Sequence, residues 1–293
     1  MNLHHFYGNL ALSVDQMPPR RGLGNQEGGY PPAYVQGAKQ GTRQMWGCLL
    51  LGIQRRSYMI DQRFQRFSAL VGEDRFSLLQ KSKVIIFGIG GVGSFVAESL
   101  ARCGIGNLTL VDFDTIALHN INRQIHALSS TVGELKAAAM AERILDINPH
   151  CRVKVIADRV TPASLDLFFR DDYDYIADAI DDVSAKIGLI LYGRSQGIPL
   201  ISSMGTGNKL DPSRLKIADI SKTSVCPLCR SVRRKLREND IEQGVTVVYS
   251  DETPIKSPMV EDGRAVPASS ALVPPSAGIL IASHIVKELI KTE

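Results

Sequence analysis

A glycine-rich loop, Gly88-Ile89-Gly90-Gly91-Val92-Gly93, follows directly on the short apolar run Lys83–Phe87. An apolar run of this length that ends at glycine predicts a buried strand, and the residues from about Val92 to Cys103 predict a helix. Glycine permits a tight turn from strand to helix, and it lets backbone N–H groups approach a phosphate at the helix N-terminus. Because the same loop also serves as a plain strand-to-helix turn, its function depends on the residues that follow it.

The rest of the chain from Ile60 onward alternates short apolar runs with amphipathic segments. This alternation predicts an α/β protein: a Rossmann-like, mostly parallel sheet with right-handed crossovers, flanked by helices. Further strands are expected at Asn107–Val111, Arg152–Ala157, Tyr173–Ala177 and Pro199–Ser203, and helices at 133–147, from Thr161-Pro162 onward, and at 183–196. From Gly205 to Pro275 the pattern loosens to a C-terminal extension of short strands, expected at Leu215–Ile220 and Val245–Ser250, before a final helix at 276–290.

Residues 1–58 differ in composition from the remainder. They contain Pro18-Pro19 and Pro31-Pro32, many glycines and glutamines, and little hydrophobic periodicity. Such a segment cannot bury enough apolar surface to offset the entropy of the chain. It is therefore predicted to be a disordered extension, or to precede the true start at Met59. A transit peptide is the alternative, and the acidic Asp15 and Glu27 argue against it.

Composition narrows the class of protein. The net charge of +4 over 293 residues is a mild surplus, which alone does not indicate nucleic acid. No run of eighteen apolar residues occurs, so a membrane-spanning helix is not expected. An odd, scattered set of cysteines is not a disulfide framework and favours a reducing, cytoplasmic location. These cysteines are Cys48, Cys103, Cys151, Cys226 and Cys229.

Charged residues after successive strands decide between a dinucleotide and a triphosphate. Asp112 ends the second strand about 20 residues beyond the loop, where a carboxylate can bind ribose hydroxyls. That arrangement suits both NAD and ATP. An NAD site has no need of an added arginine and lysine, whereas Arg123 and Lys136 can neutralise a triphosphate. Asp181, past the end of a later strand, can hold magnesium. The sequence therefore favours ATP and magnesium, with each residue individually open to being a solvated surface charge.

The runs GIGGVGS, GIGNLTLVDFD, NINRQIHA, VGELKA, INPHC and DAIDD resemble the family of ubiquitin-activating-enzyme-like adenylating proteins. The resemblance extends from about Tyr58 to the C-terminus, which implies a ThiF-type ATP-binding adenylating domain over residues 59–293. Within that family the chain is most similar to the tRNA threonylcarbamoyladenosine dehydratase branch. The segments that favour this branch are Asn122–Ala127, Ile201–Gly205, Asp219–Thr223 and the basic tract after Cys229.

The resemblance implies specific roles for residues that match the family motifs. Arg123, Lys136, Asp181 and Arg66 would be catalytic, with Asp181 also the metal ligand and Arg66 reaching the ATP of a partner subunit. The expected nucleotide-binding residues are Gly88, Gly90, Gly91, Gly93, Asp112, Asp114, Asn120 and Gln124. The chain would form a homodimer that uses ATP and magnesium to activate the carboxylate of threonylcarbamoyladenosine in tRNA, so that the modification closes to a ring with loss of water. A cysteine-desulfurase system is a further expected partner, and no membrane is expected.

The pair Cys226-Pro227-Leu228-Cys229 and the basic tract behind it bear on the substrate. Zinc-containing relatives carry two such pairs, and this sequence has one, so a four-thiolate zinc site is not expected. A redox pair is disfavoured as well, because the helix-opening context beside a strand that such a pair needs is predicted to be absent. Arginines at helical spacing then predict a basic stripe for tRNA phosphates, against a plain solvated helix face. They are Arg230, Arg233, Arg234 and Arg237.

The main alternative function is an adenylyltransferase that activates the C-terminus of a ubiquitin-like sulfur carrier. The missing second cysteine pair and the basic stripe favour tRNA over such a protein tail. An NAD-dependent oxidoreductase and a non-catalytic nucleotide-binding module are disfavoured, the first by Arg123 and Lys136 and the second by the full set of candidate ATP contacts.

Overall fold

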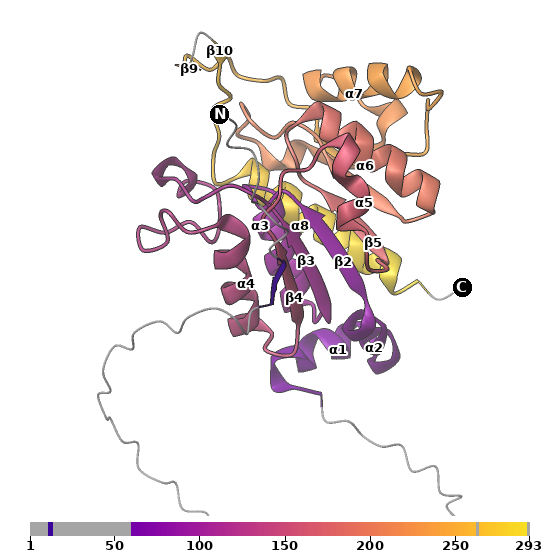
Figure 1. Ribbon diagram of the computed structural model, residues 1–293. Helices are drawn as coiled ribbons and strands as arrows, with labels where there is room; N and C mark the ends of the chain where they lie inside the picture. Colours follow the sequence, from indigo (N-terminus) through magenta and orange to yellow (C-terminus); the bar gives the residue numbers. More distant parts are fainter. Residues whose placement is uncertain (1–10, 14–59, 262–263, 292–293) are drawn as a thin grey trace, which may run out of the picture.

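The computed structural model describes residues 11–13, 60–261 and 264–291 as an α/β fold built on one large sheet (Figure 1). The sheet has the strand order β1-β4-β3-β2-β5-β6-β8-β7. Strands β2 to β6 and β8 run parallel, while β1 and β7 pair antiparallel at the two edges. The predicted mostly parallel, Rossmann-like sheet is confirmed.

The elements lie close to the predicted ranges. The strands are β1 (Ala11–Ser13), β2 (Lys83–Phe87), β3 (Asn107–Val111), β4 (Arg152–Ile156), β5 (Tyr175–Asp178), β6 (Leu200–Ser203), β7 (Leu215–Asp219), β8 (Thr246–Ser250), β9 (Val260–Glu261) and β10 (Arg264–Ala265). The helices are α1 (Gln65–Val71), α2 (Glu73–Lys81), α3 (Gly93–Arg102), α4 (Lys136–Ile147), α5 (Leu165–Phe168), α6 (Val183–Gln196), α7 (Pro227–Arg237) and α8 (Val273–Leu289).

Two helices begin elsewhere than predicted, for local reasons. Helix α4 starts at Lys136 rather than at Gly133, because Gly133 has a positive φ of 93° that belongs to a turn. Helix α8 starts at Val273, ahead of the predicted Ser276, and takes in Pro274 and Pro275. Proline fits the first turn of a helix, where the N–H that it lacks would have no intrahelical partner.

Residues 1–58 lie outside the described part of the chain except for Ala11–Ser13, which form β1 and pair with β4. The prediction of a disordered extension therefore stays a prediction. Within the described ranges, no helix is both long and apolar enough to cross a membrane.

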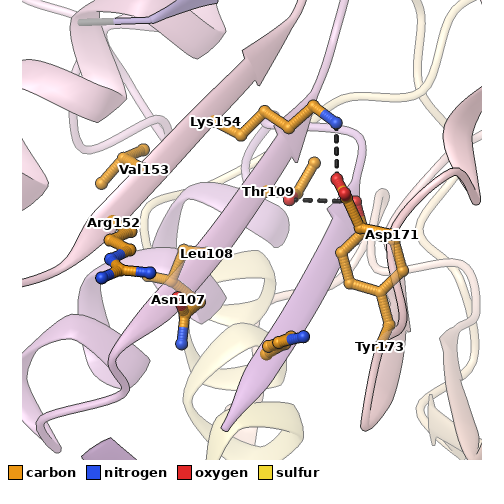
Figure 2. A pocket seen from close by; sticks show the side chains of 9 residues that line it. Asn107, Leu108, Thr109, Arg152, Val153, Lys154, Asp171 and Tyr173 are labelled. Atoms are coloured by element: carbon orange, nitrogen blue, oxygen red, sulfur yellow. Dashed lines mark hydrogen bonds and ion pairs between the residues drawn. The ribbon is translucent and has the colours of Figure 1, made fainter. Parts of the chain in front are cut away.

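A cavity of about 240 Å³ lies at the amino-terminal ends of strands β2, β3 and β4 (Figure 2). Lys83, Asn107 and Arg152, the first residues of β2, β3 and β4, line it. On its wall Lys154 pairs with Asp171 at 2.7 Å. A five-residue strand spans about 16 Å at roughly 3.3 Å per residue, so this cavity is far from the carboxyl ends where open α/β sheets bind ligands. None of the predicted site residues lines it.

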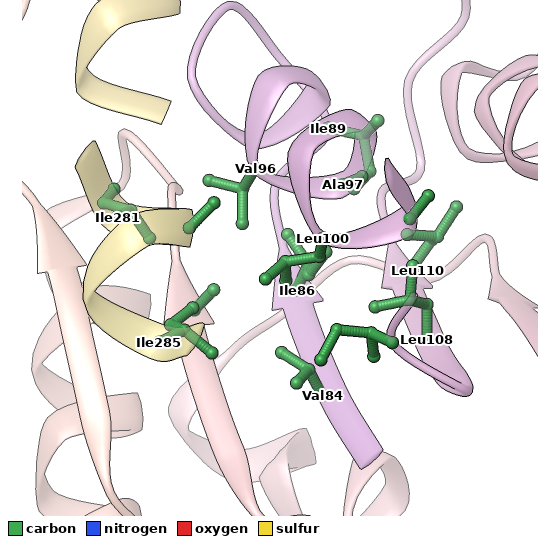
Figure 3. Packing of buried hydrophobic residues seen from close by; sticks show 14 of the residues in the cluster. Val84, Ile86, Ile89, Val96, Ala97, Leu100, Leu108, Leu110, Ile281 and Ile285 are labelled. Atoms are coloured by element: carbon green, nitrogen blue, oxygen red, sulfur yellow. The ribbon is translucent and has the colours of Figure 1, made fainter. Parts of the chain in front are cut away.

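The main core fixes the glycine loop against the sheet. Helix α3 covers one face of β2, and α8 packs on α3 and on β6, β7 and β8. Val96, Leu100, Ile281 and Ile285 of these two helices belong to the same core cluster as Ile86 of β2 (Figure 3). A second cluster fills the opposite face beneath α5 and α6. The two clusters thus hold β2 from both faces, and they fix the loop that joins the carboxyl end of β2 to α3.

Candidate active site

The glycine loop requires glycine at two of its positions. Gly88 has φ +83°, and a Cβ atom there would lie 2.8 Å from the carbonyl oxygen of Ala179. A Cβ on Gly93 would lie 1.8 Å from the carbonyl oxygen of Gly88. By contrast, the nearest atom to a Cβ on Gly90 would be Nε2 of Gln124 at 3.9 Å. Gly88 and Gly93 therefore set the turn, and Gly90 leaves backbone open toward a ligand.

Asp112 directly follows β3 and is hydrogen-bonded to the glycine loop. Its Oδ2 accepts the N–H of Ile89 at 2.6 Å, and its Oδ1 accepts the N–H of Asp114 at 2.9 Å. Burial raises the pKa of the carboxyl group, while these two N–H donors oppose the rise. The contact with Ile89 gives Asp112 a structural role besides the predicted binding of ribose, and each oxygen retains a lone pair for a hydroxyl donor.

The segment Asn120–Gln124 lies over the glycine loop. A Cβ on Gly91 would lie 3.2 Å from Cγ of Arg123, so the arginine stem packs on that glycine. The guanidinium Nη1 donates to the carbonyl of His119 at 3.1 Å and to Oδ1 of Asn122 at 2.9 Å. Burial lowers the pKa of Arg123, which means that its charge is partly desolvated and would gain from an anion.

The side chains of Asn120 and Gln124 differ in their contacts. Oδ1 of Asn120 accepts the N–H of Ala117 at 3.0 Å, which is a structural contact within the turn. Oε1 of Gln124 is buried and has no hydrogen-bond partner among the described residues. A buried amide oxygen without a partner is costly, so this group points to a donor supplied by ligand or water.

Lys136 begins α4 and faces Asp114. Its Nζ lies 2.6 Å from Oδ2 of Asp114, and its backbone N–H donates to the carbonyl of Asp114 at 3.0 Å. The lysine is buried, whereas the carboxylate side chain is 47% exposed. Lys136 and Asp114, both predicted site residues, therefore form an ion pair. A phosphate that binds here would either share Lys136 with Asp114 or take the place of the Asp114 carboxylate.

Asp181 lies in the loop after β5, which contacts the glycine loop through Ala179. Its side chain is exposed, and no described residue forms a hydrogen bond or ion pair with it. Among the described residues, no three His, Cys, Asp or Glu side chains gather to hold a metal by themselves. An open carboxylate of this kind fits magnesium, which usually takes one or two protein carboxylates together with substrate phosphates and water.

A buried ion pair that the sequence analysis did not identify anchors this loop. Asp178, the last residue of β5, lies 2.7 Å from Nζ of Lys186 on α6, and both side chains are fully buried. Nζ of Lys186 also donates to Oγ of Ser202 and to the carbonyl of Ser203. The spacing of eight residues between Asp178 and Lys186 carries no signal by itself, because the contact depends on how β5 and α6 pack.

Other predicted residues lie away from the glycine loop. Arg66 is exposed on α1, which packs with α2 beside the amino-terminal edge of the sheet (Figure 1). Arg230, Arg234 and Arg237 are exposed on α7 at helical spacing. These positions are not part of the cluster formed by Asp112, Arg123 and Lys136 within one chain.

Arg233 differs from the other three arginines of α7. Its Nη1 donates to Oγ1 and the carbonyl of Thr223 and to the carbonyl of Ile220, and its side chain is half-buried. Arg233 thus caps backbone carbonyls of the preceding segment. The exposed basic face consists of Arg230, Arg234 and Arg237, and Arg233 lies at its border with the buried face.

The cysteine pair lies in a context that the sequence analysis expected to be absent. Cys226 is the N-cap of α7, and Cys229 lies in its first turn. Both thiols are free and buried, in a cluster that also contains Met204 and Val247. The prediction that no helix opens at this pair was wrong, because helical spacing of the arginines places the helix but does not show where it starts.

His126 is buried beside the site, with 3% of its surface exposed, and neither ring nitrogen has a hydrogen-bond partner among the described residues. Burial lowers its pKa to about 4, with smaller contributions from the charges of Lys136 and Arg143. The folded protein therefore holds a neutral imidazole.

A pH-dependent loss of stability is expected from His126. Because its folded pKa is below the unfolded value of 6.5, the unfolded chain binds the extra proton, and stability falls as the pH drops from 6.5 toward 4. The loss should reach about 3 kcal/mol, at roughly 1.4 kcal/mol per pKa unit. His126→Leu should reduce this loss, measured as the free energy of urea unfolding at about pH 7 and about pH 4.5. The exposed His119, as His119→Gln, is the control, and an unchanged acid loss in His126→Leu would show that other groups cause it.

Comparisons with known proteins agree with this geometry. A model of the ThiF family matches residues 63–293. The tRNA threonylcarbamoyladenosine dehydratase of Bacillus subtilis (strain 168) is 42% identical over 240 residues, which cover 78% of this chain and 94% of that protein. The crystal structure of Escherichia coli tRNA N6-threonylcarbamoyladenosine dehydratase, TcdA, in complex with ATP aligns with a TM-score of 0.72 and 39% identity, over 78% of this chain and 94% of that one. The molybdopterin-synthase adenylyltransferase of Escherichia coli (strain K12) is 34% identical over 124 residues, which cover 42% of this chain and 49% of that protein.

Proposed function

The chain belongs to the ThiF family, and we propose that it acts as an ATP-dependent tRNA threonylcarbamoyladenosine dehydratase. The observation that supports this most directly is the cluster at the carboxyl edge of the sheet. There a glycine loop, the carboxylate of Asp112 and the cations Arg123 and Lys136 converge from separate segments. The substrate follows from the similarity to dehydratases along almost their whole length.

Each residue of the cluster has a role in this proposal. The N–H groups of the glycine loop bind phosphate oxygens at the N-terminus of α3. Asp112 accepts hydrogen bonds from ribose, with Asp114 beside it. Arg123 and Lys136 neutralise the phosphate charge. Asn120 holds the turn that precedes Arg123, and the oxygen of Gln124, unpartnered among the described residues, accepts a hydrogen bond from the ligand or from water. The carboxylate of Asp181 would hold magnesium, which would supply further positive charge to neutralise the phosphates.

The reaction follows from the chemistry of the carboxyl group. The carboxylate of threonylcarbamoyladenosine is a poor electrophile, because its oxygen is a poor leaving group. The carboxylate attacks a phosphorus atom of ATP, a phosphorus–oxygen bond of ATP breaks, and an activated acyl ester forms. A nucleophile of the same side chain then attacks the acyl carbon, closes a ring and expels the phosphate-bearing group, so that the nucleoside loses one water and ATP is consumed. Positioning and charge neutralisation supply most of the catalysis, and no nucleophile from the protein is needed.

The direct test uses the full chain with ATP, magnesium and tRNA that carries threonylcarbamoyladenosine. After digestion, mass spectrometry should find a nucleoside lighter by one water, and a chelator should abolish its formation. Unchanged nucleoside, together with pyrophosphate release when a ubiquitin-like sulfur carrier is added, would establish the adenylyltransferase alternative instead. The shorter match to the molybdopterin-synthase adenylyltransferase makes that alternative the weaker one.

We also propose that the protein works as a homodimer in which Arg66 completes the site of the partner subunit. Arg66 and Leu70 lie four residues apart on one face of α1, and Leu70 is 79% exposed. Further large apolar side chains, Leu118 and Leu128, are exposed on the segment around the candidate site. Such residues are typical of a surface that a second copy covers.

Complementation between inactive variants should reveal this arrangement. Arg66→Ala and Arg123→Ala should each be inactive alone, and mixing them with subunit exchange should restore activity at about a quarter of the sites. Random exchange makes half of the dimers mixed, and each mixed dimer holds one intact site. No recovery in a mixture shown to contain mixed dimers would place Arg66 in its own subunit's site or outside any site.

The exposed face of α7 is proposed to contact the tRNA backbone. Arg234→Ala and Arg237→Ala should each raise the KM for tRNA, with kcat and the KM for ATP almost unchanged. Each should also reduce the slope of log affinity against log salt by about one phosphate contact, since every neutralised phosphate releases counterions. Arg170, exposed after α5, provides the control Arg170→Ala. Equal effects of all three variants would mean that only overall charge matters.

A cysteine-desulfurase partner stays a prediction.

A further inference from the structure

Two sulfur atoms that take no part in the proposed reaction meet at the start of α7. Cys226 is the N-cap residue, Pro227 occupies the first helical position, and Cys229 lies one turn further in. Their exposed fractions are 2% and 0%, and both thiols are free. The side chain of an N-cap residue lies beside the second and third residues of its helix, and Cys229 is the third, so the two sulfurs lie close together.

The surroundings of Cys226 favour a negative sulfur. The backbone N–H groups of Cys229 and Gly205 help to lower the pKa of Cys226, and a Cβ on Gly205 would lie 3.7 Å from its Sγ. The N-terminus of α7 adds the positive end of a helix dipole. Hydrogen bonding from Cys229 lowers the pKa of Cys226 most, and the same contact raises the pKa of Cys229, so the shared proton stays on Cys229.

A buried lysine nearby supplies the counter-charge. Lys209 is 4% exposed, and the carbonyl of Ser250, at 3.0 Å, is the one hydrogen-bond acceptor for its Nζ among the described residues. A buried ammonium with a single neutral acceptor is costly unless an anion lies close by. The charge of Lys209 acts on the Cys226 sulfur. The charge of Lys209 therefore favours a thiolate at Cys226, although the hydrogen bonds to the sulfur contribute more.

The backbone in front of the pair is strained. Val225 has a φ of +62°, which a β-branched residue rarely adopts, and the N–H of Cys226 donates to the carbonyl of Ser224 at 2.6 Å across it. A residue held in this region costs about 1–3 kcal/mol, and such strain gathers at functional sites. The side chain of Val225 is 45% exposed. An oxidant can reach the buried Cys226 sulfur only if this turn moves, and such a movement would relieve the strain at Val225.

We propose that Cys226 and Cys229 are a redox-active dithiol, which closes to a disulfide by exchange with a low-molecular-weight disulfide such as glutathione disulfide. The Cys226 thiolate attacks one sulfur of the oxidant, an S–S bond forms between them, and one glutathione thiolate leaves. Cys229 then gives up its proton and attacks Sγ of Cys226, and the second glutathione leaves. The protein dithiol is oxidised by two electrons, and one glutathione disulfide is reduced to two glutathione molecules.

One tryptic peptide reports on the pair. Cleavage after Lys222 and Arg230 releases Thr223–Arg230, which contains both cysteines and no other. The folded full chain is equilibrated over a range of glutathione disulfide to glutathione ratios, quenched with acid, and alkylated after denaturation. The peptide should shift from two alkyl groups to none, with the loss of two hydrogen atoms, and dithiothreitol should reverse the change. Cys103 and Cys151, whose pKa burial raises to about 11 and about 12, should stay alkylated and serve as internal controls.

Single variants separate the roles of the two sulfurs. Cys229→Ser should accumulate a mixed disulfide between Cys226 and glutathione, whereas Cys226→Ser should leave Cys229 largely unmodified. Lys209→Met should move the pH midpoint of the exchange rate upward. Two alkyl groups on the peptide at every ratio would overturn the proposal. So would cysteines protected from alkylation in the folded protein until a chelator is added, with zinc found in the purified protein, because that result makes the pair a metal site. These measurements do not depend on ATP or tRNA, so they stand apart from the test of the dehydratase activity.

Discussion

Arg123→Ala is expected to lower turnover about 10²–10³-fold, the loss typical of removing one positioned donor from developing charge in an active site. The stem of Arg123 packs on Gly91, and its guanidinium is held by the carbonyl of His119 and by Asn122. It is thus oriented before a nucleotide arrives. Its guanidinium has already lost part of its hydration in the folded protein, so pairing with a phosphate costs less further desolvation. The measurement is single-turnover formation of the dehydrated nucleoside with saturating ATP.

Two controls show whether this loss comes from phosphate binding. Arg123→Lys should recover part of the rate, because a lysine supplies charge without the planar fork of guanidinium donors. The free energy of unfolding should fall by about 1–3 kcal/mol in Arg123→Ala, since two hydrogen bonds to neutral groups, each worth about 0.5–1.5 kcal/mol, are lost. Turnover within a few fold of the unaltered protein would remove Arg123 from the phosphate site. Lost turnover with a much larger loss of stability would assign the arginine a structural role.

The sequence predicted the strand positions well because each strand is a local signal. Lys83–Phe87 and Asn107–Val111 were predicted at their observed bounds, since buried parallel strands appear as short apolar runs that end at turn residues. The glycine loop and Asp112 follow the same logic, because the spacing of a strand-loop-helix unit is fixed by its geometry. Site residues on such units can therefore be placed without a structure.

Contacts between distant segments could not be predicted in this way. Arg233 has the same spacing as its neighbours on α7, yet its guanidinium is used by carbonyls of the segment near Thr223. Cys226 and Lys209 lie seventeen positions apart, and nothing in either residue type announces that one is a counter-charge for the other. The sequence shows which residues carry charge. Tertiary packing decides which charges are occupied within the protein and which stay available to a ligand.

Breaking the Asp178–Lys186 pair is expected to lower the free energy of unfolding by about 3–5 kcal/mol, the usual loss when one partner of a buried ion pair is removed. Asp178→Asn leaves a buried ammonium with two neutral acceptors from Ser202 and Ser203. Lys186→Met leaves a buried carboxylate that keeps only the Oγ–H of Ser202 and the N–H of Ile180. Urea denaturation followed by far-ultraviolet circular dichroism measures both losses.

The double variant Asp178→Leu with Lys186→Met separates the cost of an unpaired charge from the worth of the pair. If the unpaired charge dominates, the double variant should be more stable than either Asp178→Asn or Lys186→Met, because no buried charge remains. Additive losses would show instead that the two residues stabilise the fold independently. The loop 179–182 follows Asp178 and contacts Gly88 through Ala179. If the Asp178–Lys186 ion pair positions Asp181 in this loop, a stable double variant should still lose affinity for ATP with magnesium. Unchanged affinity in that variant would show that the pair serves the fold alone, and that backbone packing against the glycine loop is enough to position the carboxylate.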